Sequence, residues 1–282
     1  MCVSAVPHTH GPLPAFEPAD PGRRSFFKLG AATAAGAALA VAAPSLPARA
    51  AGHQRVVDLT HRLVKTFPSF LGPQAVFDEV LFEIETDGFY TKQWTFDEHI
   101  GTHLDTPGHF SLGMALVDEL DPSTLIAEVV VVDISRRAAV DPNATVEVSD
   151  LIAHERAYGQ IPEHALVCMY SGWAAKVADN EAFRGGAGFP DLNFPGFSAN
   201  AAEWLVRRRN PVGIGVDTMS IDPGNSADFA VHIGFLGSGR WGIENLANLD
   251  QIPARGATAF VGPIPWEEGS GSPCRVLAAV PA

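Results

Sequence analysis

The sequence predicts one sheet-rich α/β domain that follows an N-terminal leader. Short apolar runs along the chain are separated by proline and glycine. The 282 residues include 22 prolines and 27 glycines, which is typical of a sheet-rich fold with many turns. Residues 51–282 show no composition break, internal repeat or low-complexity segment. Their length exceeds the commonest domain size but suits one β-rich domain. We therefore expect residues 51–282 to fold as one unit.

Eight apolar runs are predicted to be strands. The Val-rich run from Glu128 to Ile134 is typical of a buried strand, and Asp87-Gly88 is a hairpin turn signal between two others. The predicted strands are Arg55–Thr60, Glu79–Thr86, Tyr90–Phe96, Glu128–Ile134, Ala165–Tyr170, Pro211–Asp217, Ala257–Val261 and Pro273–Val280.

Two segments are predicted to be helical. One begins at Ser149 or Asp150, either of which is a good N-cap, and runs to about Tyr158. The other spans Ser198–Arg209, and its arginine run lies at the C-terminal end, where the carbonyl dipoles favour positive charge. That position explains the arginines better than a nucleic-acid-binding patch does.

The first fifty residues resemble an export signal. Gly22–Lys28 contains a twin-arginine motif, Leu29–Ala43 is a mild apolar run, and Ala48–Ala50 is a small-residue cleavage site. The apolar run is shorter than the roughly 20 strongly apolar residues of a spanning helix. We therefore expect residues 1–50 to be a twin-arginine signal peptide. This predicts the twin-arginine export machinery as a partner, no stable membrane anchor, and a periplasmic or secreted mature chain.

The mature chain is strongly acidic. Loss of residues 1–50 would leave 15 basic and 30 acidic residues, a net charge of −15 with histidine neutral. Such a surface is soluble and disfavours nucleic acid and anionic lipid as partners. Two cysteines would remain, Cys168 and Cys274. They could pair in an oxidising compartment, but the apolar run around Cys168 favours a buried thiol.

The most informative stretch is residues 99–109, in which three histidines and an aspartate all occupy odd-numbered positions. In an extended strand, the residues at positions 99, 103 and 105 point to one face. A helix would turn the aspartate away, and the glycines and proline of the stretch oppose a helix. The stretch therefore predicts a short strand that presents His99, His103 and Asp105 together, with His109 just beyond a Pro-Gly turn.

Two imidazole nitrogens and a carboxylate oxygen suit a divalent metal such as zinc or manganese. A single histidine is more often satisfied by ordinary hydrogen bonds. A cluster of this kind is the expected signature of a ligand set, so the metal interpretation is favoured over that alternative.

The pattern His-x-Gly-Thr-His-x-Asp-x-Pro-x-His, present here at residues 99–109, resembles the signature of the cyclase-like metal-dependent hydrolases. This family includes bacterial kynurenine formamidase and isatin hydrolase. The segments Asp58–Thr60, Ser171–Trp173 and Asp217–Asp222 also resemble the family. The resemblance implies a swivelling β/β/α fold, with a mixed, barrel-like sheet and flanking helices, assembled as a homodimer or homotetramer.

The resemblance also implies a second pair of metal ligands, His232 and Glu244. They are twelve residues apart, as in the two-metal members, and the segment Ile243–Leu246 resembles the family's Glu-Asn-Leu segment. In that arrangement His99, His103 and Asp105 hold one ion, while Asp105 bridges to a second ion held with His232 and Glu244. The number of ions per subunit, one or two, is left open.

A divalent ion activates water and polarises a carbonyl, which is the chemistry of amide and ester hydrolysis. His109, not needed in the implied ligand set, is the expected general base and then acid. No Gly-x-Ser-x-Gly motif occurs, which weakens a serine hydrolase interpretation. Phe67, Phe70, Phe77 and Trp173 are candidate walls of a substrate pocket, with core packing as the alternative for each. Asp217 and Asp222 are either acceptors behind the ligands or turn caps.

The resemblance implies an amidohydrolase that cleaves a formamide or a cyclic amide beside an aromatic ring. The predicted export would separate the chain from the cytoplasmic breakdown of tryptophan. N-formylkynurenine is therefore one candidate among aryl formamides, isatin-like lactams and lactones. Two alternatives are a lactone or ester hydrolase of the same fold and a non-catalytic periplasmic metal-binding protein.

Overall fold

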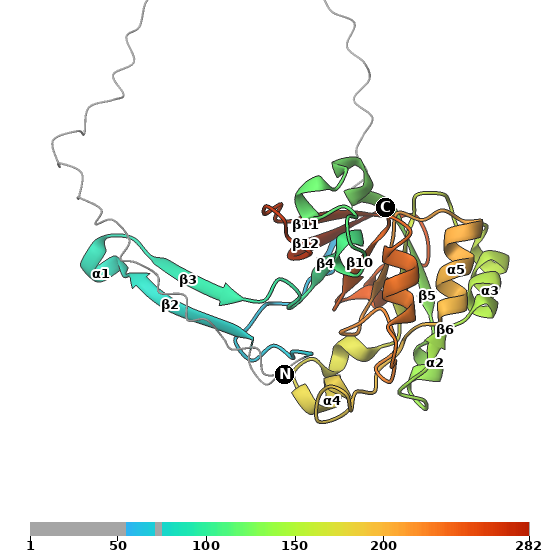
Figure 1. Ribbon diagram of the computed structural model, residues 1–282, viewed down its shortest axis with the longest axis horizontal. Helices are drawn as coiled ribbons and strands as arrows, with labels where there is room; N and C mark the ends of the chain where they lie inside the picture. Colours follow the sequence, from blue (N-terminus) through green and yellow to red (C-terminus); the bar gives the residue numbers. More distant parts are fainter. Residues whose placement is uncertain (1–54, 71–74, 282) are drawn as a thin grey trace, which may run out of the picture. The chain divides into compact units, whose positions relative to one another are not determined.

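A closed, mixed β-sheet forms the centre of the molecule (Figure 1). The computed structural model describes residues 55–70 and 75–281, which belong to one compact unit spanning Arg49–Ala282. The predicted signal peptide lies outside the described residues. Within the described residues, no helix combines the length and apolarity needed to cross a bilayer.

Strands and short helices alternate along the described chain. The strands are β1 (Arg55–Asp58), β2 (Val76–Phe82), β3 (Thr91–Phe96), β4 (His103–Asp105), β5 (Ile126–Asp133), β6 (Thr145–Val146), β7 (Leu166–Tyr170), β8 (Gly196–Phe197), β9 (Gly213–Val216), β10 (Trp241–Glu244), β11 (Ala257–Pro263) and β12 (Gly271–Val280). The α-helices are α1 (Ile84–Asp87), α2 (Ser135–Ala138), α3 (Val148–Tyr158), α4 (Asn180–Arg184) and α5 (Ala199–Arg208).

The long strand β12 closes the sheet. It pairs with β11 along one edge, while on the other edge β4 pairs with residues 271–273 and β1 with residues 277–280. The ring therefore runs β12, β11, β5, β7, β9, β10 and β4, and returns to β12. Neighbours among β5, β7, β9 and β10 are parallel, and the other pairs in the ring are antiparallel. This confirms the predicted mixed, barrel-like sheet with flanking helices.

The strands bury side chains on both sides of the sheet. Val129 and Val131 of β5 pack inside the ring with residues of β7, β10, β11 and β12. Val130 and Val132 face the other way and pack beneath α3 and α5, which lie side by side in Figure 1. A strand that is buried on both faces needs a continuous apolar sequence, which explains the Val-rich run predicted to be a buried strand.

The glycines of β9 leave room inside the ring. A Cβ atom at Gly213 would lie 2.3 Å from the ring of Trp241, and one at Gly215 would lie 2.7 Å from the side chain of Leu246. Cys168 packs in the same interior, and both it and Cys274 are free, buried thiols. The structure thus confirms the buried-thiol prediction and contains no disulfide between them.

Most predicted elements are confirmed with shifted ends, but two local predictions are wrong. Ile84–Asp87 forms a helical turn instead of extending the first hairpin strand, and Gly88 follows it with a φ of +80°. The helix expected to start with Ser149 or Asp150 as N-cap instead begins at Val148. The Asp150 carboxylate accepts a hydrogen bond of 2.8 Å from the backbone N–H of Glu147, so this aspartate lies in the first turn and caps it from inside.

Candidate metal centre

The predicted metal-binding stretch lies on β4, which is held between β10 and β12. His103 lies opposite Glu244 of β10, and Asp105 lies opposite Gly242. Leu104 points into the interior cluster of the ring, so its two neighbours point to the outer side. The alternation predicted from odd-numbered positions is therefore correct for His103 and Asp105.

His99 reaches the site by a different route from the one predicted. The strand does not extend back to it, because Gly101 adopts a φ of +68° and turns the chain before β4 begins. His99 nevertheless approaches Asp105, with 2.6 Å between Nδ1 of the ring and Oδ1 of the carboxylate. A Cβ atom at position 271 would lie 2.4 Å from the His99 ring, so the start of β12 must be glycine for this ring to fit.

Two side chains of β4, His103 and Asp105, meet two from later in the chain, His232 and Glu244. Nε2 of His103 lies 3.3 Å from Asp105 Oδ1 and 3.4 Å from Glu244 Oε2. Nε2 of His232, at the start of the π-helical turn His232–Leu236, lies 3.3 Å from Glu244 Oε1 and 3.6 Å from Asp105 Oδ2. All four side chains are buried.

These separations fit a shared metal ion better than direct hydrogen bonds. Two donor atoms each about 2.1 Å from a tetrahedral zinc ion are about 3.4 Å apart, whereas an N–H···O hydrogen bond spans about 2.9 Å. Asp105 Oδ2 is buried and has no hydrogen-bond partner among the described residues. Such an orphaned carboxylate oxygen is costly unless a cation occupies its lone pairs. The residues present therefore fit a divalent ion.

In three of the histidines, one ring nitrogen faces the cluster and the other contacts a protein oxygen outside it. His103 Nδ1 contacts the carbonyl oxygen of Gly101 at 2.9 Å, and His232 Nδ1 contacts the Asp222 carboxylate at 2.6 Å. His99 Nε2 contacts Ser270 Oγ at 2.9 Å, and the Ser270 hydroxyl in turn donates to Glu98. Such partners fix which nitrogen faces the metal in a metal site.

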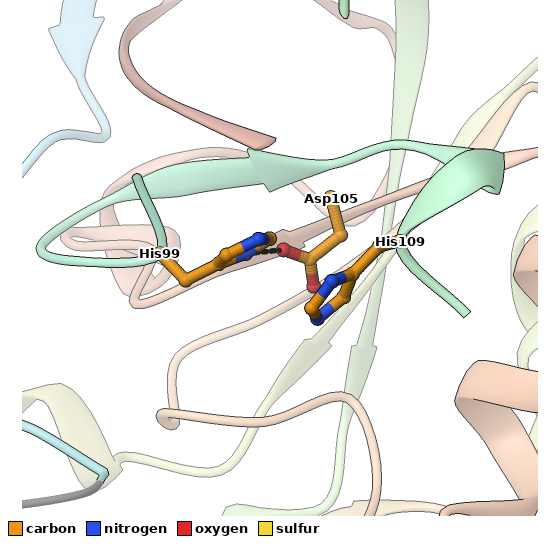
Figure 2. Close-up of side chains that lie close together, drawn as sticks. All are labelled: His99, Asp105 and His109. Carbon is orange, nitrogen blue, oxygen red and sulfur yellow. Dashed lines mark hydrogen bonds and ion pairs between the residues drawn. The ribbon is translucent and has the colours of Figure 1, made fainter. Parts of the chain in front are cut away.

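The Asp105 carboxylate lies beside the rings of His99 and His109 (Figure 2). The two rings stack with 3.9 Å between their centroids. Ligand atoms fall into two groups that share Asp105: one with His103 and Glu244, and one with His99 and His109. This grouping differs from the expected division, in which His99 and His103 shared one ion and His109 stood outside the ligand set. The structure shows no hydrogen-bond partner for the His109 ring among the described residues.

Burial and neighbouring charge set opposite pKa shifts within the cluster. Burial would lower the pKa of His103, but the Asp105 and Glu244 carboxylates outweigh it and raise this pKa to about 10. Burial likewise opposes the shift at His232, whose pKa is raised well above its ordinary value by Asp105, Asp222 and Glu244. A metal ion must displace these protons, so its affinity for the site falls as the pH falls. At His109 burial dominates and lowers the pKa to about 4.

The cluster forms the floor of a cavity of about 290 Å³. Its walls are aromatic and apolar, with 5.6 Å between the ring centroids of Phe110 and Phe229 and 6.2 Å between those of Phe70 and Phe229. Met219 completes the apolar lining, and Asp97 is part of the wall. A planar aromatic group fits such walls.

Of the predicted walls, Phe70 lines this cavity, whereas Phe67, Phe77 and Trp173 do not. Phe67 is buried in a separate cluster with Val76 and Ile100. Trp173 packs with Phe183 and donates a hydrogen bond of 2.7 Å from Nε1 to its carbonyl oxygen. Core packing, the alternative for both residues, is therefore what the structure shows.

The two aspartates after β9 support neighbouring segments. Asp222 is an acceptor behind His232, since its carboxylate accepts from the backbone N–H groups of Val231 and His232 as well as contacting the ring. Asp217 accepts from the backbone and hydroxyl of Ser171 and from the backbone N–H of Trp173. Burial raises the pKa of Asp217 to about 6 despite these donors.

Several site residues were not predicted from the sequence. Phe110 directly follows His109, and Phe229 lies three residues before His232, so adjacency to the candidate ligands could have identified both. Ser270 and Glu98 gave no such signal, because they meet only when the start of β12 crosses the turn before β4.

Replacement of Asp222 should weaken metal binding. Asp222→Ala removes the acceptor that orients His232, and we expect metal affinity to fall about 10- to 100-fold, measured by competition with a chromophoric chelator. Asp222→Asn keeps an acceptor oxygen and should lose less. Asp228→Ala changes an exposed carboxylate in the same segment and serves as the control. Unchanged affinity in a folded Asp222→Ala variant would contradict this role.

The sequence of this chain is similar to those of known proteins. Residues 57–223 match the family model Cyclase, described as "Putative cyclase". Isatin hydrolase from Roseibium aggregatum is 34% identical over 209 residues, which cover 71% of this chain and 79% of the relative. Kynurenine formamidase from Polaromonas naphthalenivorans is 26% identical over 231 residues, covering 82% and 93%.

A solved structure agrees with these sequence matches. Isatin hydrolase A from Ralstonia solanacearum superimposes with a TM-score of 0.78 at 34% identity, covering 86% of this chain and all of the other. The residues matched by the family model include the stretch 99–109 with its three histidines, and the superposition covers 86% of this chain. The chain therefore belongs to the Cyclase family.

Proposed function

We propose that this chain hydrolyses the amide bond of a cyclic amide fused to an aromatic ring, with isatin as the first candidate. The observation that carries the proposal is the convergence of histidine and carboxylate ligand atoms, 3.3–3.6 Å apart, on the floor of an aromatic cavity. The similarity to isatin hydrolase, at 34% identity against 26% for the Polaromonas formamidase, supports a cyclic amide over a formamide.

His103, Asp105, His232 and Glu244 would hold the ion, with His99 beside them. When bound, a divalent ion such as zinc or manganese lowers the pKa of a water molecule towards about 7 and polarises a carbonyl oxygen. The mixed nitrogen and oxygen donors accommodate either metal.

His109 is the group that moves protons in this proposal. Its ring lines the cavity, and among the described residues it has no hydrogen-bond partner that would hold either nitrogen. Such an imidazole can accept a proton from the attacking water and return it to the leaving nitrogen. Stacking on His99 holds the ring beside the carboxylate of Asp105.

The cavity walls determine which amide reaches the floor. Phe70, Phe110 and Phe229 would contact the faces and edges of an aromatic ring, which aligns a bond attached to that ring with the ligand cluster below. The apolar walls also exclude bulk water, which strengthens the electrostatic effects inside the cavity. An aryl formamide has the same reacting bond and remains the second candidate, supported by the kynurenine formamidase similarity over 82% of this chain.

We also propose that the chain is exported through the twin-arginine route, on the strength of the motif at residues 22–28 and the cleavage site at 48–50. Export of a folded, metal-loaded enzyme would place the activity in the periplasm or outside the cell.

Purified full-length protein should open the lactam ring of isatin in a metal-dependent way. A panel of isatin, an aryl formamide and an aromatic lactone would be assayed with the enzyme as purified, after chelation, and after return of zinc or manganese. We expect isatin to be the fastest substrate, with activity lost on chelation and restored by metal. Turnover that survives complete metal removal would rule out the proposed chemistry.

His109→Asn should separate catalysis from metal binding. We expect kcat to fall about 10²- to 10⁴-fold, while the metal content measured by elemental analysis is unchanged. His164→Asn, at an exposed histidine distant in sequence, is the matched control and should keep wild-type kcat. Loss of metal from His109→Asn would instead show that His109 is a metal ligand, in agreement with its grouping with His99 and Asp105.

Conservative replacement of the arginine pair should block export. In cells that express the full chain, we expect Arg23→Lys combined with Arg24→Lys to retain the protein in the cytoplasmic fraction in its uncleaved form. Arg207→Lys combined with Arg208→Lys, on α5, is the control for loss of paired arginines. Equal periplasmic recovery of both double variants would show that this motif does not direct export.

A further inference from the structure

The ring of Phe189 extends the aromatic wall of the cavity beyond the residues that line it. Phe189 lies outside the set of lining residues, yet its ring centroid is 5.6 Å from that of Phe70 and 6.3 Å from that of Phe229. Such separations are typical of aromatic pairs. Phe189 is also 54% exposed. Its ring therefore continues the wall outward and leaves apolar surface open to solvent.

Phe229 lies between Phe189 and the candidate ligands. Its ring centroid is 5.9 Å from that of His232, and the planes of these two rings are nearly perpendicular. The planes of Phe229 and Phe189 are closer to parallel, with an angle of 24° between them. Exposure increases along this series, because His232 is buried, Phe229 is partly buried and Phe189 is exposed. The three rings therefore lead from the floor of the cavity to its mouth.

The loop that carries Phe189 is closed and anchored. The backbone N–H of Asp191 donates a hydrogen bond of 2.7 Å to the carbonyl oxygen of Gly188, which closes a turn around Phe189. Leu192 follows directly and is buried in the same apolar cluster as Met219, a residue of the cavity wall. The ring is thus presented by a fixed turn, and an aromatic group that is already in place costs less to order when a ligand binds.

The backbone of Phe229 has an unusual conformation. Its φ is +51°, in the left-handed region that bulky residues rarely adopt. Its N–H donates a hydrogen bond of 3.1 Å to Oγ of Ser226, which supports the turn. Strained residues of this kind persist where the surrounding structure fixes them, and they cluster at ligand-binding sites. The strain is what a ring held in place for a ligand requires.

We propose that Phe189 is a specificity-determining residue of this site, and that the substrate carries a second apolar ring that packs against it. The reacting ring would lie deeper, between Phe110 and Phe229. A residue that only supported the inner wall would gain most by burying its own ring, whereas Phe189 keeps an open surface, which suits a stacked or edge-on aromatic partner. The substrate class is therefore an aromatic amide with an aryl substituent.

The identity of the reacting amide rests on the proposed function, but the second ring does not. Phe189 contacts the wall and none of the candidate metal ligands. Its replacement should therefore change the binding of an extended substrate and leave the reaction of a small one unaffected.

Kinetics of the full-length, metal-loaded protein would compare isatin with isatins that carry a phenyl group at each free position of the benzene ring. For the best of these substrates, Phe189→Ala should raise KM about tenfold with kcat unchanged, and both constants for isatin should stay at wild-type values. Phe189→Tyr keeps the ring and should restore the wild-type KM. Phe260→Ala, at an exposed phenylalanine of β11, is the matched control. Equal KM values for wild type and Phe189→Ala on every phenyl isatin would overturn the proposal.

A binding experiment separates this inference from the proposed function. Biphenylmethanol and benzyl alcohol differ by one ring and contain no amide, so calorimetric titration can measure both whether or not isatin is a substrate. The ratio of their affinities should be about tenfold smaller in Phe189→Ala than in the wild type. An unchanged ratio would refute the second-ring contact even if isatin is hydrolysed. A reduced ratio without isatin turnover would support the contact, and the proposed function alone would fail.

Discussion

The position of β4 is the constraint on which the rest of the site depends. This strand has three residues, and it is paired on one edge with β10 and on the other with β12. Its central residue, Leu104, is anchored in the interior of the ring. A slip of one residue would turn Leu104 outward and bury both His103 and Asp105 inside the barrel. Closure of the sheet through β12 therefore also sets which side chains can meet a metal.

The cluster beside β4 concentrates charge in a place that water barely reaches. Asp105 and Glu244 are 1% and 5% exposed, and His103 and His232 are 2% and 4% exposed. Buried ionised groups are unfavourable unless they are paired and hydrogen-bonded or bind metal. Without an ion, protons on the two histidines balance the two carboxylates. The acceptors behind the rings keep the nitrogens aimed at the same point, so these candidate ligands are already arranged in the structure without an ion.

The sequence predicted the convergence of the candidate ligands better than it predicted the cavity walls. His103 and Asp105 follow from strand alternation alone, and the Val-rich β5 follows from burial on both faces. His99 did not follow from alternation, because the turn at Gly101 depends on contacts made by β12. Of the predicted walls, Phe70 lines the cavity but Phe67 and Trp173 pack in the core, since nothing local distinguishes a buried aromatic residue in the core from one that faces a cavity. Such a distinction is made by the packing of loops that are distant in the sequence.

Three candidate ligands lie on strands and the aromatic walls of the cavity lie on loops, which affects how this site can change. His103, Asp105 and Glu244 belong to paired strands, whereas Phe70, Phe110 and Phe229 lie outside the strands. Loops accept substitution and changes in length more readily than the strands they connect. Variation at the three phenylalanines could therefore redirect the enzyme to substrates of different size while the ligand set stays intact. The same barrel is a suitable starting scaffold for selecting new amidases, with diversity confined to the rim of the cavity.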